Sequence, residues 1–224
     1  MRPVSDQSVL PDEKKVFRIL IADDHAIVRI GLAILIKNMD NSIHIEEATD
    51  GESVIRQLKS GLFDLLILDI NMPGTESFSL TRYLKEEFPP LKILVFTINQ
   101  EVLFAKRFLK LGVHGYIIKQ FNESEIGNAI RTIMDGHVYI SDMLIGIISN
   151  DIIGNQKHNP FEKLSDREFG LVLQILKGYE VKEIAHTLHL NESTVRTHRS
   201  RIMKKLKLSG TVDLMNLAKQ HNLL

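Results

Sequence analysis

The chain of 224 residues carries 28 lysines and arginines against 28 aspartates and glutamates, so its formal net charge is zero. At about 100–200 residues per domain, this length fits one large domain or two small ones. The sequence has no cysteine, which excludes disulfide frameworks, Cys-based zinc sites and thiol nucleophiles. No apolar run approaches the roughly 18–20 residues of a membrane span. Taken alone, the zero charge argues against nucleic-acid binding.

In the first half of the chain, short apolar runs alternate with stretches of helical periodicity. Residues 1–15 lack a continuous apolar core, so we interpret them as a disordered leader and not as a signal peptide. Short apolar runs then predict buried strands at 17–22, 43–48, 65–68, 93–97 and 116–118. Helices are predicted between them at 26–38, 52–60, 77–87, 102–111 and 123–134. This alternation predicts an α/β domain over 16–136, with a doubly wound, five-stranded parallel sheet.

The first and the last of these helices carry different sequence signals. In the helix at 26–38, Ile27, Ile30, Ile34 and Leu35 lie on one apolar stripe. The helix at 123–134 is preceded by Asn122 with Glu125 three residues on, a capping-box arrangement.

Polar residues follow the predicted strands at their carboxyl ends, where doubly wound sheets bind ligands. They are Asp23 and Asp24, Asp69, Thr97 and Lys119. Three carboxylates in one small pocket need a cation, and Mg²⁺ prefers such oxygen ligands. A carboxylate nucleophile, a metal, a lysine and a hydroxyl are what phosphoryl transfer to an aspartate requires. Taken singly, each residue has a plainer explanation, and Asp24 is equally well explained as a helix N-cap.

Four motifs at these positions resemble those of the receiver domain of two-component response regulators. They are IADD at 21–24, LDINMPG at 68–74, FT at 96–97 and GYIIK at 115–119. The resemblance implies that Asp69 is the phosphoacceptor and that Thr97 and Lys119 contact the phosphoryl group. It implies that Tyr116 is a switch residue that turns inward when Thr97 moves. The Mg²⁺ ligands that it implies are the carboxylates of Asp24 and Asp69, the backbone carbonyl of Asn71 and, through water, Asp23.

The sequence departs from the family after the switch threonine. Ile98 stands where Ala, Ser or Gly is usual, and we expect this bulky residue to slow both phosphodonor entry and phosphate loss. Gln120 follows the lysine where many relatives have Pro or Asp.

Residues 137–159 are predicted to be a linker with a short helix. The apolar stretch 143–153 predicts the helix, capped by Ser141 or Asp142, and a turn-rich polar run follows at 154–160. The helix is expected to pack on one of the two domains. A contact that changes with phosphorylation is the alternative.

Residues 160–224 show only helical signals and predict a small all-α domain. Ser165 and Glu168 form a capping box that opens a helix to about 177, and Gly178 ends it. Two short helices at 181–188 and 192–206, the second capped by Asn191, give a helix-turn-helix pattern, and a last helix covers 211–220. In the helix at 192–206, the core-facing stripe is Val195, Ile202 and Leu206.

The charges separate between the two halves. Residues 160–224 hold 11 basic and 7 acidic residues, whereas 1–159 hold 17 and 21. Residues 196–207 contain six cations and no anion, on a helix suited to a major groove. The spacing of His186 and His189 alone permits a metal pair, but no third ligand of suitable spacing is evident, so we do not favour metal binding there.

This half resembles the LuxR-type helix-turn-helix of the NarL/FixJ group, through LSDRE at 164–168, VKEIAHTL at 181–188 and NESTVRTHRSRIMKKLKL at 191–208. The DNA contacts expected from the resemblance and the charge pattern are Arg196, Thr197, Ser200, Arg199, Lys204 and Lys182. The residues that the resemblance places on the dimerisation helix are Val212, Leu214, Met215 and Leu217.

These observations predict a cytoplasmic, phosphorylation-controlled transcriptional regulator without a membrane association. A sensor histidine kinase or a small phosphodonor modifies Asp69 with Mg²⁺, which changes homodimerisation and promoter binding. The chain is then not a turnover enzyme. Two alternatives stay open: an aspartate-based phosphohydrolase in which Asp69 turns over, and a constitutive DNA-binding protein whose receiver serves only as a dimer scaffold.

Overall fold

The computed structural model describes residues 16–98, 102–119, 123–153, 159–188, 190–221 and 223. The predicted leader, the Asn122 cap, Gln120, His189 and most of the polar turn at 154–160 lie outside these residues.

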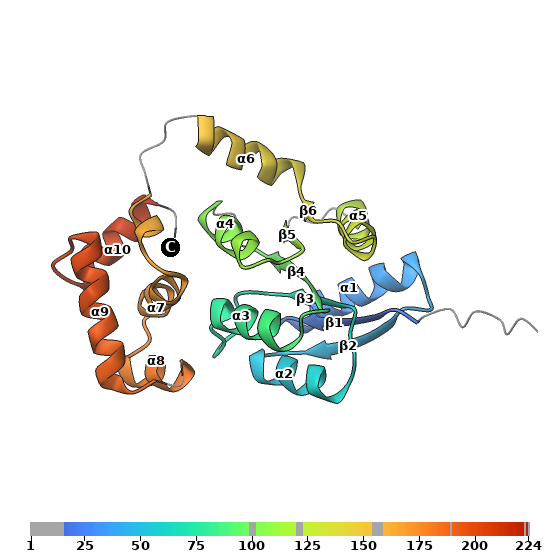
Figure 1. The fold of residues 1–224 in the computed structure, drawn as a ribbon, viewed down its shortest axis with the longest axis horizontal. Coiled ribbons are helices and arrows are strands. Elements are labelled where there is room, and N and C mark those ends of the chain that lie inside the picture. The colour runs from blue at the N-terminus through green and yellow to red at the C-terminus, as the bar shows by residue number, and fades with distance from the viewer. Residues whose placement is uncertain are drawn as a thin grey trace, which may run out of the picture.

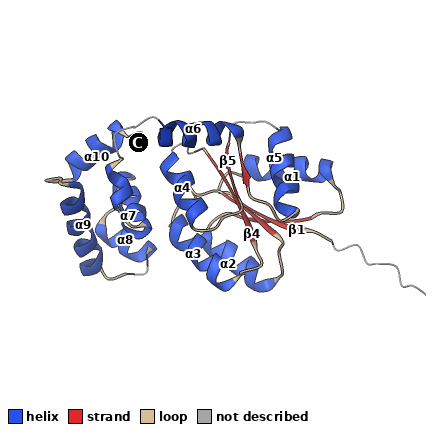
Figure 2. Cartoon of the chain, turned by 45° about the horizontal axis from the view of Figure 1, so that its top comes forward, coloured by secondary structure: helices blue, strands red, loops and turns tan. Residues whose placement is uncertain are grey.

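A parallel sheet forms the centre of the first half of the chain (Figures 1 and 2). Its strand order is β2-β1-β3-β4-β5-β6. This is the doubly wound arrangement, in which the chain adds β2 on one side of β1 and the later strands on the other side. The strands are β1 (Arg18–Ala22), β2 (His44–Ala48), β3 (Leu65–Leu68), β4 (Lys92–Thr97), β5 (Gly115–Ile118) and β6 (Tyr139–Ile140). The two-residue β6 was not predicted. It pairs with β5 inside the segment expected to be linker, where the Tyr139 N–H donates to the His114 carbonyl at 2.9 Å.

Five helices cover the two faces of this sheet: α1 (Ala26–Met39), α2 (Gly51–Ser60), α3 (Ser77–Glu87), α4 (Val102–Lys110) and α5 (Glu123–Met134). Helices α1 and α5 pack on one face over the buried β-branched and aliphatic residues of β1 and β3. Helices α2, α3 and α4 cover the other face. The predicted five-stranded α/β core is confirmed.

The apolar stripe predicted for α1 is not its core face. Ile27, Ile30 and Ile34 are 77%, 51% and 57% exposed, while Leu32 and Ile36 are buried. The helix carries apolar side chains almost all the way round, so its sequence pattern alone does not select the face that the sheet covers.

The linker helix is α6 (Asp142–Ile153), and it lies against α4 (Figure 1). The Leu144 N–H donates to the Ser141 hydroxyl at 3.3 Å. Of the two predicted caps, Ser141 and Asp142, it is therefore Ser141 that caps the helix. Leu144 is fully buried and Ile148 packs against the core beneath it. The expectation that this helix packs on a domain is confirmed.

The second half consists of a 3₁₀ turn, η1 (Pro160–Lys163), and four helices: α7 (Asp166–Leu176), α8 (Val181–Thr187), α9 (Glu192–Leu206) and α10 (Thr211–Gln220). The predicted capping box forms at α7: the Ser165 N–H donates to Glu168 at 2.8 Å and the Glu168 N–H donates to the Ser165 hydroxyl at 3.3 Å. Gly178 follows α7 with a φ of 85°, the left-handed conformation that favours glycine. Asn191 precedes α9, but its side chain makes no capping bond.

The two halves meet where α7 packs against α3 and its side chains contact α4 (Figures 1 and 2). Phe169 on α7 is fully buried, with its ring 5.8 Å from that of Phe78 and 5.2 Å from that of Phe104. No helix in the described part of the chain is long and apolar enough to cross a membrane.

Candidate phosphorylation pocket and DNA-binding face

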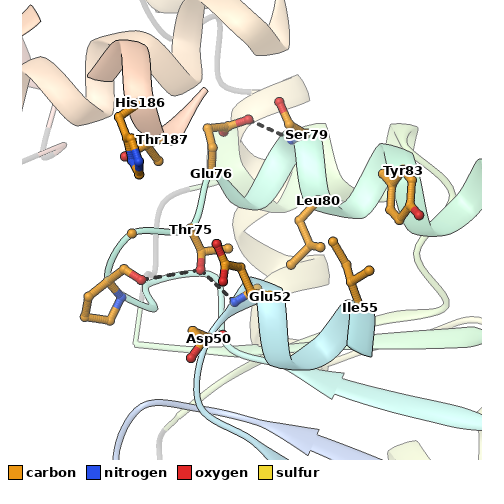
Figure 3. A pocket seen from close by; sticks show the side chains of 13 residues that line it. Asp50, Glu52, Ile55, Thr75, Glu76, Ser79, Leu80, Tyr83, His186 and Thr187 are labelled. Atoms are coloured by element: carbon orange, nitrogen blue, oxygen red, sulfur yellow. Dashed lines mark hydrogen bonds between the residues drawn. The ribbon is translucent and has the colours of Figure 1, made fainter. Parts of the chain in front are cut away.

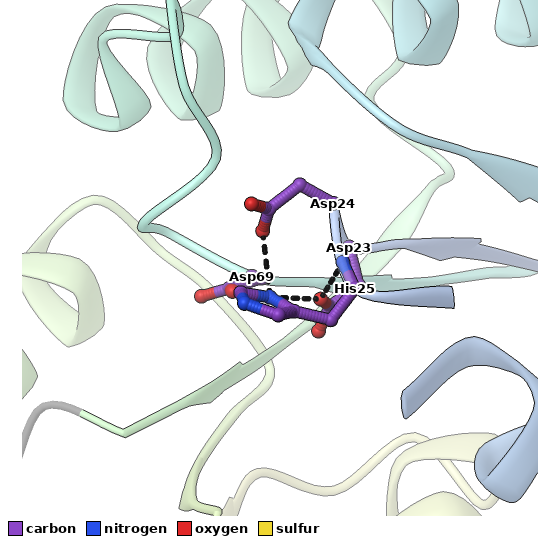
Figure 4. A group of neighbouring side chains, drawn as sticks. All are labelled: Asp23, Asp24, His25 and Asp69. Atoms are coloured by element: carbon purple, nitrogen blue, oxygen red, sulfur yellow. Dashed lines mark hydrogen bonds and ion pairs between the residues drawn. The ribbon is translucent and has the colours of Figure 1, made fainter. Parts of the chain in front are cut away.

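Three aspartates lie together at the carboxyl edge of the sheet, as predicted (Figure 4). Asp23 and Asp24 follow β1, and Asp69 follows the neighbouring strand β3. One ligand atom from each, together with one from His25, falls within 4.8 Å of the others. Asp23 and Asp69 are 1% and 3% exposed, so their negative charges are held close together with little water around them.

Lys119, directly after β5, neutralises part of this charge. Its ammonium group donates to Asp23 Oδ2 at 2.5 Å and to Asp69 Oδ2 at 2.7 Å. Burial raises the pKa of Asp69, and the hydrogen bond and positive charge of Lys119 offset this only in part. One cation therefore faces at least two carboxylates, and the pocket retains an excess of negative charge.

Thr97, at the end of β4, is fully buried beside this cluster. Its hydroxyl accepts a hydrogen bond from the Asn71 side-chain amide at 3.0 Å. The Asn71 backbone N–H in turn donates to Asp69 Oδ1 at 3.0 Å. The five polar strand-end residues of the sequence prediction thus lie in one pocket, where Asn71 joins Asp69 to Thr97 and Lys119 joins Asp69 to Asp23.

The residues present fit a hard divalent cation. The helix-cap explanation for Asp24 is wrong, because α1 has His25 at its N-cap position and no side-chain capping bond. Asp24 Oδ1 is instead a buried oxygen without a hydrogen bond of acceptable geometry, and His25 Nδ1 lies 3.0 Å from it. An oxygen of this kind, next to two further carboxylates, is a suitable ligand for Mg²⁺.

His25 was missed by the sequence analysis. Its backbone N–H donates to Asp23 Oδ1 at 2.8 Å, and its Nδ1 lies 3.0 Å from Asp24 Oδ1. Its position directly after the paired aspartates is the signal that was available.

Tyr116 and Ile98, for which the sequence analysis predicts roles beside the pocket, differ in their burial. Tyr116 is fully buried, with its ring 6.4 Å from that of Phe108, so the structure already holds it in the inward position. Ile98 is 68% exposed.

A hollow of about 570 Å³ lies between α2, α3 and the end of α8 (Figure 3). Ile55, Leu80 and Tyr83 form its apolar wall. Its polar groups serve the local backbone: the Thr75 hydroxyl accepts from the Gly51 N–H, and Glu76 accepts from the Ser79 N–H. The described residues that line it include none of the five strand-end residues, so we do not place the chemistry there.

Helix α9 presents a polar, basic face to solvent. Val195, Ile202 and Leu206 are buried, as predicted, and fix the orientation of the helix. The exposed side chains on it include Arg196, Thr197, Ser200 and Lys204, and Lys182 is exposed on α8. Arg199 differs from these, because it donates to the Thr211 hydroxyl at 2.6 Å and ties α9 to α10.

The four residues expected on the dimerisation face of α10 do not share one environment. Val212 and Met215 are 71% and 40% exposed, and Leu217 is half-buried. Leu214 is fully buried within its own domain, so its side chain is unavailable to a second copy. The helical period places Leu214 on the opposite side of α10 from Val212. The family resemblance, which put all four residues on the dimerisation helix, did not separate these two sides.

Comparisons with known proteins agree with both halves of this description. Residues 19–131 match the response regulator receiver domain, and residues 162–218 match the bacterial regulatory proteins of the luxR family. The oxygen regulatory protein NreC of Staphylococcus carnosus is 33% identical, over 92% of this chain and 99% of that protein. The response regulator UvrY of Escherichia coli is 31% identical, over 92% and 94%.

Among solved structures, RcsB of Salmonella enterica serovar Typhimurium superposes with a TM-score of 0.69 and 27% identity, over 91% of this chain and 98% of that one. That structure is bound to the rprA promoter in the presence of the phosphate mimic BeF₃⁻. The acidic pocket, the helix-turn-helix and these matches together show that this chain belongs to the response regulators that join a receiver domain to a LuxR-type DNA-binding domain.

Proposed function

We propose that this protein is a cytoplasmic transcriptional regulator whose promoter binding is controlled by phosphorylation of Asp69. The observation that carries the proposal is the placement of the Asp69 carboxylate against Lys119, with Asp23, Asp24 and Thr97 in the same pocket. A histidine kinase, or a small phosphodonor, supplies the phosphoryl group. Asp69 forms the new bond to phosphorus as the donor's bond to phosphorus breaks and its electron pair leaves with the donor.

Mg²⁺ would be held by the carboxylates of Asp24 and Asp69 and the backbone carbonyl of Asn71, and by Asp23 through water. When bound, it supplies positive charge for the phosphoryl oxygens. The chain's own contribution is to hold Asp69 in place through the Asn71 N–H and to direct the Lys119 ammonium at the same carboxylate. Thr97 then donates its hydroxyl to the phosphoryl group, and Tyr116 stays in the inward position that it already holds.

The output surface of this proposal is α9. Arg196, Thr197 and Ser200 read base edges in the major groove, whereas Lys204, Arg199 and Lys182 contact the phosphate backbone. Two copies pair through α10, with Val212 and Met215 as its exposed apolar residues. RcsB, which is 27% identical, was captured on promoter DNA with a phosphate mimic, and this supports the same link between phosphorylation and DNA in this chain.

The test is phosphorylation followed by DNA binding. Acetyl phosphate with Mg²⁺ should add one phosphoryl group to wild type, measured by intact mass, and none to Asp69→Ala. Asp50→Ala is the matched control, because Asp50 caps α2 outside the pocket and should leave the modification unchanged. Phosphorylated wild type should bind DNA recovered by random-sequence selection more tightly than the unmodified protein.

The outcomes separate the alternatives. Continuous phosphate release from model esters would make the protein a phosphohydrolase. DNA affinity that is equal with and without the phosphodonor would make it a constitutive DNA-binding protein. Either result overturns the proposal.

A further inference from the structure

A hollow of about 820 Å³ lies apart from both sites described above. Its walls come from α3 and α4, from the linker helix α6 that lies against α4 (Figure 1), and from η1 with the start of α7. Among the described residues that line it, none belongs to the phosphorylation pocket or to the proposed DNA contacts. Pockets that bind small molecules commonly enclose about 300–1,000 Å³, so this hollow is large enough to hold one.

Positive charge dominates the lining of this hollow. Among the described residues that line it, five carry a positive charge: Arg82, Lys106, Arg107, Lys110 and Lys163. Two others among these residues, Glu162 and Asp166, carry a negative charge, which leaves an excess of three positive charges. By contrast, the whole chain has no net charge. We call this site the basic hollow, and its charge favours an anionic ligand.

Arg107 gives the basic hollow a buried and fixed cationic group. It is 7% exposed, and its Nη2 donates to the backbone carbonyls of Phe161 and Leu164 at 2.9 and 2.7 Å. The guanidinium lies 4.6 Å from the centre of the Phe169 ring, and its Nη1 donates to Asp166 at 2.7 Å. The Nε atom is buried and donates to no described residue. A buried donor of this kind is commonly explained by a bound water or ion, so it indicates an acceptor in the hollow.

Aliphatic side chains lie beside these charges. Leu103 of α4 and Leu164, directly after η1, are 6% and 3% exposed, and Ile148 of α6 is half-buried. All three line the basic hollow. Small-molecule sites combine apolar walls of this kind with a few polar groups that fix the orientation of the ligand. A ligand that joins an apolar ring to an anionic group therefore fits this lining better than a simple anion does.

The excess of positive charge matches a diphosphate group. A terminal phosphate carries about −1.5 to −2 charges at pH 7, and an inner phosphate adds a further charge. Arginine and lysine both bind phosphate oxygens, the first as a planar fork and the second as a point charge. Lys110, at the end of α4, and Lys163, at the end of η1, are exposed, so a ligand in the hollow can reach both ammonium groups.

We propose that the basic hollow binds a small molecule of the nucleoside diphosphate class. The phosphates lie against Lys110, Lys163 and Arg82, and the ring lies on Leu103 and Ile148. Phosphorylation, Mg²⁺ and DNA take no part in this binding. Because the ligand touches α4, α6 and η1 at once, its binding stabilises the arrangement in which these elements meet.

Isothermal titration of the full chain with ADP, in EDTA and without a divalent ion, measures this binding. The acidic pocket then has no metal to attract phosphate, so the basic hollow should take up one ADP per chain. Pyrophosphate and adenosine each offer half of the match, and each should bind about tenfold more weakly than ADP. Lys110→Gln and Lys163→Gln should each weaken ADP binding by about tenfold, because each removes a charged hydrogen-bond donor. ADP should also shift the methyl NMR signals of Ile148.

Two further variants separate this site from a general attraction between lysines and phosphate. Lys204→Gln and Lys59→Gln each also remove an exposed lysine, the first on α9 and the second on α2. Neither should change the affinity for ADP. All four substituted lysines are exposed, so every variant should keep the circular dichroism and the urea midpoint of the parent. A loss of ADP affinity then reports on the site and not on the fold.

The proposal is overturned if ADP does not bind, or if Lys110→Gln and Lys163→Gln bind it as the parent does. A loss of affinity in Lys204→Gln alone would place the anion on the DNA-binding face of α9 and overturn it too. Equal affinities for ADP and pyrophosphate would overturn the nucleoside class. A loss of DNA affinity in Lys110→Gln and Lys163→Gln, measured by fluorescence anisotropy, would assign the hollow to nucleic acid instead. None of these titrations involves Asp69 or a phosphodonor, so they do not depend on the proposed function.

Discussion

Lys119 is the residue on which the electrostatics of the pocket depend. Its single ammonium group donates to two buried carboxylates, those of Asp23 and Asp69. Two buried aspartates can lie this close to one another because the Lys119 ammonium lies between their carboxylates. A divalent ion is the natural complement for the negative charge that remains. Under the proposed function, the same lysine therefore has a structural role before phosphorylation and a chemical one during it.

Removing this ammonium should destabilise the fold strongly when no divalent ion is present. Breaking a buried ion pair by deleting one partner costs about 3–5 kcal/mol, because the remaining charge is left uncompensated. We expect Lys119→Ala to lower the urea midpoint at pH 7 in EDTA, and Asp69→Asn in the same chain to recover part of the loss. Lys59→Ala, an exposed lysine on α2, should change stability by no more than about 0.5 kcal/mol. Equal midpoints for Lys119→Ala and Lys59→Ala would contradict this account.

At the scale of single elements, the start of α7 shows how one carboxylate serves two purposes. Glu168 closes the capping box with Ser165 and also accepts from Lys205 on α9 at 2.7 Å. Burial alone would raise the pKa of Glu168, but the hydrogen bonds from Lys205 and the Ser165 N–H outweigh it and hold the pKa below its usual value. The charged carboxylate thus stabilises α7 and its packing on α9.

This lowered pKa predicts a pH-dependent contribution to stability. The pKa of Glu168 is lower in the folded than in the unfolded chain, so its contribution is present above the unfolded value of about 4.5 and is lost as the pH falls through the folded value. Glu168→Gln keeps an acceptor for the capping box but removes the charge. We expect it to cost about 1 kcal/mol at pH 7 and almost nothing near pH 3, measured by urea unfolding. A difference between the two proteins that is independent of pH would show that the charge is unimportant.

At the scale of the whole molecule, the zero net charge is the sum of two domains with opposite net charges. The acidic pocket belongs to one, and the basic helix α9 belongs to the other. Two cations on α9 also hold the helix to its own domain, because Lys205 pairs with Glu168 and Arg199 donates to the Thr211 hydroxyl. Exposed Arg196 and Lys204 are therefore the sharper test of the surface.

Substitutions at these two positions should have different effects on DNA binding. Arg196→Ala should cost about 1–3 kcal/mol on selected DNA and relax the preference at one base position. Lys204→Ala should weaken all sequences alike and reduce the slope of log affinity against log salt by about one. Fluorescence anisotropy over a series of salt concentrations measures both. Lys59→Ala should leave affinity and slope unchanged, and identical effects of Arg196→Ala and Lys204→Ala would contradict the assignment of separate roles.

The amino-acid sequence by itself determined the order of the main elements, β6 excepted, and the five strand-end residues that meet in the pocket. Alternating apolar runs predict the strands of the sheet, and polar residues at their carboxyl ends must meet at one edge because the strands are parallel. In α9, Val195, Ile202 and Leu206 are the only apolar stripe at helical spacing, so the buried face was predictable. The local signals at Ser165, Glu168 and Gly178 also sufficed.

Only the tertiary structure decided which of several equivalent surfaces are covered. Helix α1 is apolar nearly all round, and only its position on the sheet leaves Ile27 and Ile34 exposed while Leu32 is buried. The docking of α7 on the receiver explains why the Arg107 guanidinium donates to Asp166 and why Gly170 lies against the Glu76 carboxylate, for which the local sequence gives no reason. Periodicity and capping act between residues that are near in the chain. Burial at a boundary depends instead on partners 54 to 94 positions away, whose approach no local pattern encodes.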